Sequence, residues 1–311
     1  MNNIRLTIII PSYNVDSFIT KALESIKNQS IKNQYEVLII DDGSKDDTGK
    51  IVKEWIEKNN LSNSFKYYLK TNGNWGSVIN YVKDKKLVNG KYVSILDADD
   101  YFLDNCFEKV FLHIDKNYDL IVSNFFRKRK NKLVNTKVMF SSKSKVLKKE
   151  RSFSAWSIPL CKFFKYELFN QLENLKENVS YQDQILFNRF LIRSKSIYFI
   201  KKNLGVYYEN REGSSTRAAW NENRINLWCE NMNNLLALDS REVNAYVMMM
   251  IDYCYRNSSK ELKHLVKIES KYIEKFKKAK FTWLHFGTRI LAKFIFTIST
   301  RKIIKNSKQK K

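Results

Sequence analysis

Glycine, proline and cysteine are all scarce in this sequence. Its 311 residues include 8 Gly, 2 Pro and 4 Cys. So little Gly and Pro excludes a low-complexity linker and a collagen-like or Pro-rich tract, and the sequence contains no internal repeat. The cysteines are far apart and have no paired spacing, at positions Cys106, Cys161, Cys229 and Cys254. They therefore predict neither a metal cluster nor a disulfide framework, and they favour a reducing compartment.

The N-terminus lacks the pattern of a secretion signal. Its first apolar run, Leu6–Ile10, is too short for the core of a signal peptide and is followed directly by Pro11. This predicts a cytoplasmic protein. With 43% hydrophobic residues, the chain has enough apolar surface for a full core, in one large domain or two smaller ones.

Acidic residues are outnumbered, since 56 Lys and Arg accompany 32 Asp and Glu and the net charge is +24. Such a charge favours nucleic acid, anionic lipid or anionic small substrates as partners. From Arg256 onward there are 17 Lys or Arg and 3 acidic residues, so over half of the excess lies in the last fifth of the chain. No zinc-finger or RNA-binding aromatic motif is present, so nucleic acid is not the expected partner. The chemistry and the basic surface are expected to be separate functions.

Short apolar runs alternate with helical patterns over the first hundred residues. The predicted strands are Leu6–Ile10, Tyr35–Ile40, Phe65–Leu69 and Tyr92–Leu96. Between them, apolar spacing predicts helices over Ser17–Gln29, from Asp47 or Thr48 to Ile56, and over Gly76–Lys86. Strands that alternate with helices at short spacing predict an open α/β sheet of parallel strands. Ligands of such sheets bind beyond the carboxyl ends of the strands.

Acidic and polar residues follow three of the predicted strands. Asp97, Asp99 and Asp100 follow the fourth, Asp42 follows the second, and Tyr13 follows the first. A hard divalent cation binds through one or two carboxylates together with water and the oxygens of a substrate diphosphate. An acidic surface turn would also explain the aspartates, because Asp is common in turns. The convergence of three strand ends at one edge favours a functional site instead.

Four segments, in this order, resemble family 2 glycosyltransferases with the GT-A fold, of the bacterial surface-polysaccharide type. They are residues 10–14 (IPSYN), 41–48 (DDGSKDDT), 72–80 (NGNWGSVIN) and 90–100 (GKYVSILDADD). The resemblance continues more loosely to residue 217. It implies a GT-A catalytic domain over residues 1–217, with an open, mainly parallel sheet flanked by helices. Residues 218–311 would form a helical C-terminal extension, which helical spacing over Asn221–Asn257 supports.

The resemblance also implies residues that bind a nucleotide-sugar donor. The backbone of Pro11 and Ser12 and the ring of Tyr13 would hold the base. Asp42 would accept a hydrogen bond from the base ring. Asp99 would be the direct ligand of Mn²⁺ or Mg²⁺ on the donor diphosphate.

The other implied donor contacts lie in the aspartate-rich segment and in the helix before it. Asp97 would lie near the ribose or a metal-bound water, Ala98 completes this Asp-X-Asp motif, and Asp100 is an alternative contact. Asn80 matches the family pattern, whereas Val78–Ile79 stands where many members have Ala-Arg. The missing Arg removes the reason to expect a phosphate contact from this helix.

Later segments carry the implied base and acceptor contacts. The family has its catalytic base in a Glu-Asp pair, which Gln182 and Asp183 match only at the Asp. An Asp just before a helix is otherwise an N-cap, but a carboxylate there stays ionised, which suits a base. Trp156 would stack on an acceptor sugar, and a core Trp fits almost as well. Arg211, in a loop that spans residues 207–217, would reach the diphosphate or would simply be exposed.

Two basic segments remain. Residues 125–149 predict a solvated hairpin or loop, with contact to an anionic acceptor as the alternative. Phe281–Ile298 interleaves apolar residues with His285, Arg289 and Lys293, which share one helical stripe. Charges in mid-segment argue against a spanning helix, so we predict a basic amphipathic helix on an anionic membrane surface. The alternative is a helix docked on the protein's own core or on a partner subunit.

Together these features predict an inverting, metal-dependent glycosyltransferase. It would move a sugar from a nucleotide-sugar donor, which we expect to be a UDP-sugar. The sugar would go to a hydroxyl of a glycan or lipid-linked acceptor in cell-surface polysaccharide synthesis. It would lie peripherally on the inner face of the plasma membrane. The alternative is a non-catalytic nucleotide-sugar-binding or membrane-docked partner subunit, which would not need Asp97, Asp99 and Asp183. A nucleotidyltransferase would need a Gly-rich phosphate loop after the first strand, and residues 11–14 are not one.

Overall fold

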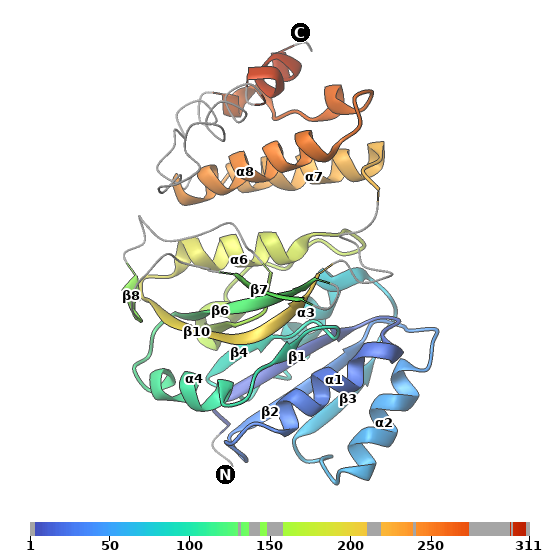
Figure 1. Ribbon diagram of the computed structural model, residues 1–311, viewed down its shortest axis with the longest axis vertical. Helices are drawn as coiled ribbons and strands as arrows, with labels where there is room; N and C mark the ends of the chain where they lie inside the picture. Colours follow the sequence, from blue (N-terminus) through green and yellow to red (C-terminus); the bar gives the residue numbers. More distant parts are fainter. Residues whose placement is uncertain are drawn as a thin grey trace. The chain divides into compact units, whose positions relative to one another are not determined.

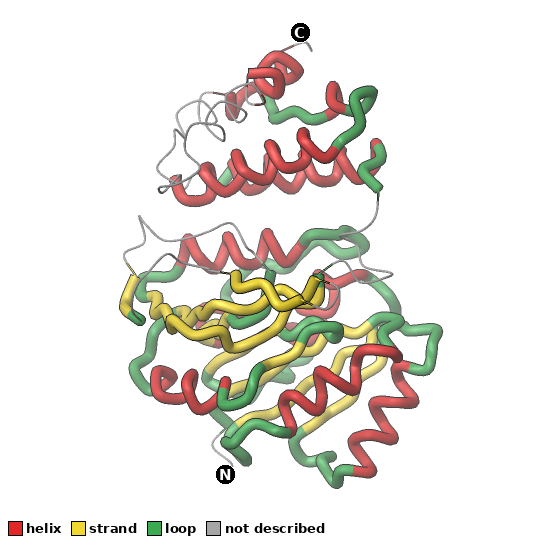
Figure 2. The backbone as a smooth tube through the Cα atoms, viewed as in Figure 1, coloured by secondary structure: helices red, strands yellow, loops and turns green. Residues whose placement is uncertain are grey.

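The computed structural model describes residues 4–129, 132–136, 144–147, 158–209, 219–238, 241–273, 299 and 301–308 (Figure 1). The chain divides into two compact units, Met1–Thr216 and Arg217–Lys311. The first unit holds a sheet with helices on both faces, and the second is helical (Figure 2). In the described ranges, no helix is both long enough and apolar enough to span a membrane.

The first half of the sheet consists of four parallel strands, as the apolar runs predict. They are β1 (Leu6–Ser12), β2 (Tyr35–Asp41), β3 (Phe65–Leu69) and β4 (Tyr92–Ile95), in the spatial order β3-β2-β1-β4. The connecting helices are α1 (Asp16–Lys27), α2 (Thr48–Lys58) and α3 (Asn74–Asp84). Because β1 pairs with β2 on one side and β4 on the other, the residues that follow these three strands meet at one edge.

The second half of the sheet is mixed. Strand β9 (Lys162–Lys165) lies antiparallel between β4 and β6 (Leu120–Arg129), and β10 (Ile197–Tyr208) runs parallel to β6. Three short strands pair antiparallel with these: β5 (Tyr101–Phe102), β7 (Lys132–Thr136) and β8 (Lys145–Leu147). The remaining helices of this unit are α4 (Cys106–Ile114), α5 (Tyr166–Asn170) and α6 (Gln182–Arg193).

Two sequence predictions for this half can be compared with the strands. The basic segment after residue 125 does form a hairpin, since β6 and β7 pair antiparallel from Phe125 and Thr136 to Arg129 and Lys132. The predicted loop over residues 207–217 begins two residues too early. Tyr207 and Tyr208 belong to β10, where they pair with β6, and the sheet register rather than loop chemistry places them.

The main core lies between the sheet and the helices α1, α2 and α4. Alternate residues of β1, namely Leu6, Ile8 and Ile10, belong to this core, whereas Ile9 is buried on the opposite face. Figure 1 shows α1, α2 and α4 on one side of the sheet and α6 on the other. Burial on both faces explains why the strand sequences are continuous apolar runs rather than alternating ones.

One close backbone approach sets the start of β4. Gly90 donates its N–H to Thr7 Oγ1 at 2.9 Å. A Cβ at this position would lie 2.5 Å from Thr7 N and 2.7 Å from the carbonyl carbon of Leu6. Glycine is therefore the residue that lets β4 enter the sheet beside β1, and β4 carries the aspartates of the predicted site.

The C-terminal unit contains two long helices. Helical spacing predicted one stretch over Asn221–Asn257, and the structure divides it into α7 (Glu222–Leu236) and α8 (Arg241–Asn257). Asn221 caps α7, because its side chain accepts a hydrogen bond from Arg224 N at 2.9 Å. Two short 3-10 turns follow at Lys263–Leu265 and Ser270–Tyr272. The predicted amphipathic segment Phe281–Ile298 lies outside the described residues.

Candidate active site

The carboxyl ends of β1 and β2 are joined by backbone and side-chain hydrogen bonds. Asp42 N donates to Ser12 O at 2.8 Å. Asn14 takes a left-handed conformation (φ 49) and accepts a bond from Lys45 N at 2.8 Å. These contacts leave Pro11 half-buried and Ser12 buried, and Tyr13 is 45% exposed. An exposed ring beside a fixed backbone is a suitable surface for a planar base.

Asp42, directly after β2, is buried and has several partners. Its side chain is 4% exposed and pairs with Lys70 Nζ, 2.6 Å from Oδ1. Gly73 N donates to both carboxylate oxygens, at 3.0 Å to Oδ1 and 3.2 Å to Oδ2. Ser77 Oγ also lies 3.4 Å from Oδ1. Each oxygen offers two lone pairs, so Oδ2, with fewer of these contacts, retains capacity for the predicted bond to a base.

The segment after β4 turns sharply and directs its aspartates differently. Asp100 N donates to Asp97 O at 2.9 Å, which closes the turn. Ala98 is buried, and Asp100 is 1% exposed and accepts a bond from Tyr208 N at 2.8 Å. Asp97 and Asp99 are half-buried. The turn therefore fixes Asp100 to the sheet and leaves Asp97 and Asp99 nearer the solvent.

Trp75 is a partner of the aspartate-rich segment that the sequence pattern did not single out. It lies in the first turn of α3, and its indole N–H donates to Asp97 Oδ1 at 3.0 Å. A hydrogen bond to a carboxylate is stronger than one between neutral groups and fixes the orientation of the side chain. The predicted segment 72–80 thus reaches the site through Trp75.

Asp183 comes to the same region from α6. It lies in the first turn of the helix, after Tyr181, which takes a left-handed conformation (φ 65). The link is Tyr207, whose pKa is raised by burial and then by the charges of Asp100, Asp99, Asp97 and Asp183. The charges of all four carboxylates therefore act on one phenol of β10. The aspartates after β4 and the aspartate of α6 lie within electrostatic range of this phenol, although they are separated by more than 80 residues.

Burial raises the pKa of Asp183 from its ordinary value of 3.8 to about 6. The N–H groups of Gln184 and of Asp183 itself, and the charge of Lys162, act in the opposite direction but do not cancel it. The side chain is half-buried in the folded chain. A carboxylate with a pKa near 6 is still mostly ionised at neutral pH and is a stronger proton acceptor than an exposed one.

Two residues of the predicted motifs serve the structure of the protein. Asn80 is buried, donates to Leu175 O (2.9 Å) and Glu177 Oε1 (3.0 Å), and accepts from Leu175 N (2.9 Å). A donor contact from Asn80 would require breaking one of these bonds. Gln182, at the position of the family's Glu, is buried and accepts a bond from Lys176 N at 3.1 Å. Both residues hold the segment before α6, and so they hold Asp183.

Trp156 and Arg211, the predicted acceptor and diphosphate contacts, lie outside the described residues. In the part of the chain that is described, no group of three or more His, Cys, Asp or Glu side chains converges on a metal site. The donor set still suits Mn²⁺ or Mg²⁺, because Asp97 and Asp99 are hard oxygen ligands that reach the solvent side. Such ions need only one or two carboxylates when a diphosphate and water supply the other oxygens.

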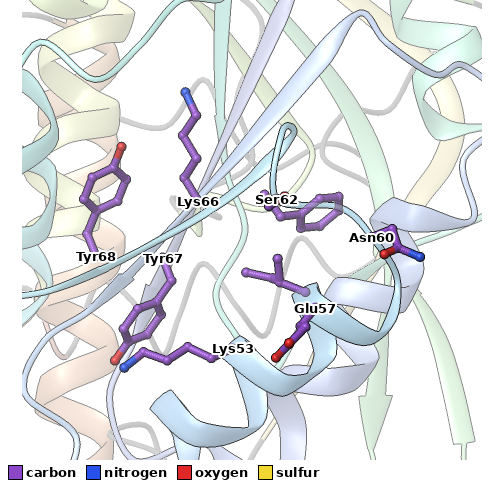
Figure 3. A pocket seen from close by; sticks show the side chains of 9 residues that line it. Lys53, Glu57, Asn60, Ser62, Lys66, Tyr67 and Tyr68 are labelled. Carbon is purple, nitrogen blue, oxygen red and sulfur yellow. The ribbon is translucent and has the colours of Figure 1, made fainter.

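A separate hollow of ≈ 580 Å³ lies beside the edge strand β3 (Figure 3). Figure 3 shows Tyr67 and Lys53 pointing toward each other, and Lys53 Nζ lies 4.9 Å from the centroid of the ring. The Tyr67 hydroxyl donates to Asp41 Oδ2 at 2.7 Å. The aspartates that follow β4 do not line this hollow. It is therefore distinct from the carboxylate cluster.

Comparison with known proteins identifies the family of this chain. The profile of Glycosyl transferase family 2 matches residues 7–196. The glycosyltransferase MG025 homolog of Mycoplasma pneumoniae is 34% identical over 308 residues, which cover 97% of each chain. The minor teichoic acid biosynthesis protein GgaB of Bacillus subtilis is 26% identical over 288 residues, which are 88% of this chain and 31% of GgaB.

A solved structure supports the same fold. TarS of S. aureus, residues 1–349, in complex with UDP-GlcNAc superposes with a TM-score of 0.71 at 20% identity, covering 98% of this chain and 89% of TarS. The expected α/β architecture, a central sheet flanked by helices as in the GT-A fold, is confirmed. The match over residues 7–196, the full-length relative and the shared fold establish that this chain belongs to glycosyl transferase family 2 and is a glycosyltransferase.

Proposed function

We propose that this glycosyltransferase is inverting and metal-dependent, and that it transfers a sugar from a UDP-sugar to a hydroxyl group of a glycan or lipid-linked acceptor. Asp99, assisted by Asp97, would hold the metal on the donor diphosphate. Asp183 would take the proton of the acceptor hydroxyl as it attacks the anomeric carbon. Direct attack of this kind inverts the configuration at that carbon.

The observation that carries this proposal is the shared neighbourhood of Tyr207. Its pKa is raised by burial and then by the charges of Asp100, Asp99, Asp97 and Asp183. A metal-binding pair and a proton acceptor serve one displacement only if they lie around the same substrate. Their common effect on the pKa of Tyr207 supports this requirement, which sequence spacing alone cannot test.

The donor side rests on Tyr13 and Asp42. The exposed ring of Tyr13 offers a face for the base, and Asp42 Oδ2 retains acceptor capacity for a ring N–H. Lys70 fixes the Asp42 carboxylate, so a base would meet a preorganised acceptor. The UDP-GlcNAc complex of the structural neighbour TarS supports a UDP-sugar as the first donor to test.

A bound Mn²⁺ or Mg²⁺ would act as a Lewis acid that neutralises the leaving nucleoside diphosphate. The residues of this chain would position the carboxylates and accept the proton. Trp75 holds the Asp97 carboxylate, and the bond from Tyr208 N holds Asp100 and with it the turn. Asp183, with its pKa of about 6, is ionised at neutral pH and basic enough to share a proton with a sugar hydroxyl in the transition state.

The acceptor is proposed from similarity and charge. GgaB, named a minor teichoic acid biosynthesis protein, aligns with 88% of this chain. This similarity supports a cell-surface polysaccharide as the acceptor class. The 17 Lys or Arg from Arg256 onward support attachment to an anionic membrane surface at its cytoplasmic side. Such a location would bring the enzyme to a lipid-linked acceptor.

The test measures release of nucleoside diphosphate by the purified full chain from a panel of nucleotide sugars, with and without Mn²⁺. We expect a UDP-sugar to be consumed only when the metal is present. Asp183→Asn should lower turnover by about 10²–10⁴-fold, the usual contribution of a general base. Donor binding by the same variant should be nearly unchanged, since Asp183 acts on the acceptor.

The matched control is Asp104→Asn, which neutralises an exposed carboxylate near the same segment. It should keep wild-type turnover. Equal loss of donor binding and turnover in Asp183→Asn would remove its role as base. Turnover that is indifferent to chelation would remove the metal from the proposal.

A further inference from the structure

Lys162 is a fully buried lysine that the proposed reaction does not use. It opens β9 and is 1% exposed, among the largest fully buried side chains of the described chain. Its carbonyl accepts a hydrogen bond from Ser94 Oγ at 2.9 Å, and its backbone pairs with Val122. The strand is therefore held on both sides. Burying an ammonium is costly unless a partner compensates for it, so its surroundings require an explanation.

Two contacts position the ammonium of Lys162. Its Nζ donates to Ile158 O, and it lies 4.9 Å from the centroid of the Phe187 ring. Phe187 follows Asp183 by four residues on α6, so both side chains lie on the same face of the helix. The ammonium is thus fixed against α6 one turn after Asp183, on the same face of the helix.

The two charged groups act on each other. Burial lowers the pKa of Lys162 to about 8, and the charges of Cys161 and then of Asp183 oppose it. Burial raises the pKa of Asp183, and the charge of Lys162 opposes it together with the N–H groups of Gln184 and Asp183. From β10, Tyr207 is coupled to Asp183.

Other charged groups lie before α6 and further along it. Lys176 and Glu177, before its first turn, are exposed. Glu173 pairs with Arg189 at 3.4 Å, and the charge of Arg189 acts on Lys83 of α3. Arg189 stands six residues after Asp183. Lys162 is therefore the cation that the described structure couples to Asp183.

We propose that Lys162 is a positioning residue that holds Asp183 in its ionised, proton-accepting form; this rests on the proposed function. A buried ammonium is costly, and an apolar side chain of the same volume would fill the site at lower cost. The ammonium against α6 instead resolves a conflict within the site. Asp183 must be buried enough to be basic, and a positive charge beside the same helix face favours its ionised form at neutral pH.

The test replaces Lys162 by two neutral residues, Lys162→Met and Lys162→Gln, and measures kcat/KM against pH with a nucleotide sugar that the wild type consumes. Without the nearby cation, the pKa of Asp183 rises, so more of it is protonated at a given pH. The acid limb of the profile should move upward by about one pH unit, the lower end of the effect of an adjacent opposite charge. On the acid side of both profiles, each variant, scaled to its own plateau, should be about tenfold less active than the wild type at the same pH.

The matched control is Lys83→Met. Lys83 is half-buried and, like Lys162, donates to a backbone carbonyl, that of Leu172, but it lies beside Arg189, further along α6. Its acid limb should coincide with that of the wild type. An acid limb that stays in place in both Lys162 variants would overturn the proposal, and so would an equal displacement in Lys83→Met.

A direct titration separates this proposal from the proposed function. Carboxylate ¹³C NMR of the full chain, with Asp183→Asn to assign the resonance, reports the pKa of Asp183 without any turnover. An upward displacement in Lys162→Met or Lys162→Gln supports the pairing even if no sugar nucleotide is consumed, in which case the proposed function alone fails. An unmoved resonance in an active enzyme overturns the pairing and leaves the proposed function standing.

Discussion

Replacing Asp183 by Asn should make the protein more stable while it removes activity. Burial raises the pKa of folded Asp183 from 3.8 to about 6, so ionisation disfavours the folded state above pH 6 and has no effect below pH 3.8. The difference corresponds to about 3 kcal/mol, at about 1.4 kcal/mol per pH unit. This free energy already includes the effect of Lys162, because the charge of Lys162 contributes to the pKa of Asp183.

Asn is nearly isosteric with Asp but carries no charge, so it should recover part of this free energy. The amide remains buried and accepts weaker hydrogen bonds from the helix N-terminus, which leaves roughly 1–2 kcal/mol of stabilisation. For a unit of this size that is roughly 2–8 °C in the melting temperature. The gain should be largest at pH 7.5 and should mostly disappear at pH 4, where Asp183 is protonated in the wild type as well.

The assay is thermal unfolding of the full chain at pH 7.5 and at pH 4, for the wild type, Asp183→Asn and the exposed control Asp104→Asn. The control should melt with the wild type at both pH values. A variant that melts at or below the wild-type temperature at pH 7.5 would show that Asp183 is not held in an unfavourable ionised state. The argument for a tuned base would then fail.

Further predictions concern the metal, the Trp75 contact and the sheet. Asp99→Asn should raise the Mn²⁺ concentration for half-maximal turnover by about tenfold or more, and an unchanged requirement would exclude Asp99 as a ligand. Trp75→Phe, which removes the N–H bond to Asp97 but keeps a ring, should lower kcat/KM by about tenfold with little change in melting temperature. Gly90→Ala forces a Cβ to 2.5 Å from Thr7 N and should destabilise the protein by about 1–3 kcal/mol in denaturant unfolding. A Gly90→Ala protein as stable as the wild type would contradict the close approach of β4 to β1.

The parallel half of the sheet could be predicted from sequence because local physics determines it. Continuous apolar runs such as Leu6–Ile10 are typical of strands that are buried on both faces of a sheet. The helices between them follow the usual apolar spacing of helices. Each run is followed by polar residues, so the position of Asp42 and of Asp97 at strand ends follows directly. The family resemblance adds the roles of these residues, which spacing alone does not supply.

The rest depends on contacts between distant segments. The approach of Asp183 to Tyr207 and the burial of Lys162 arise from the antiparallel insertion of β9 and from the packing of α6, and neither has a local signature. Trp75 could have been noticed, because an aromatic residue at the start of a helix beside a predicted site is a candidate contact. Asn80 shows the opposite case, in which a residue that matches the motif holds a neighbouring segment.

The most direct test of the central claim is a crystal structure of the full chain with Mn²⁺ and a UDP-sugar that resists transfer. The claim is that the strand-end carboxylates and Asp183 serve one displacement. It predicts the metal on Asp99, the base over Tyr13, and the Asp183 carboxylate facing the anomeric carbon from the side opposite the diphosphate. A donor bound in the hollow beside β3, or one with Asp183 turned away from the sugar, would contradict it.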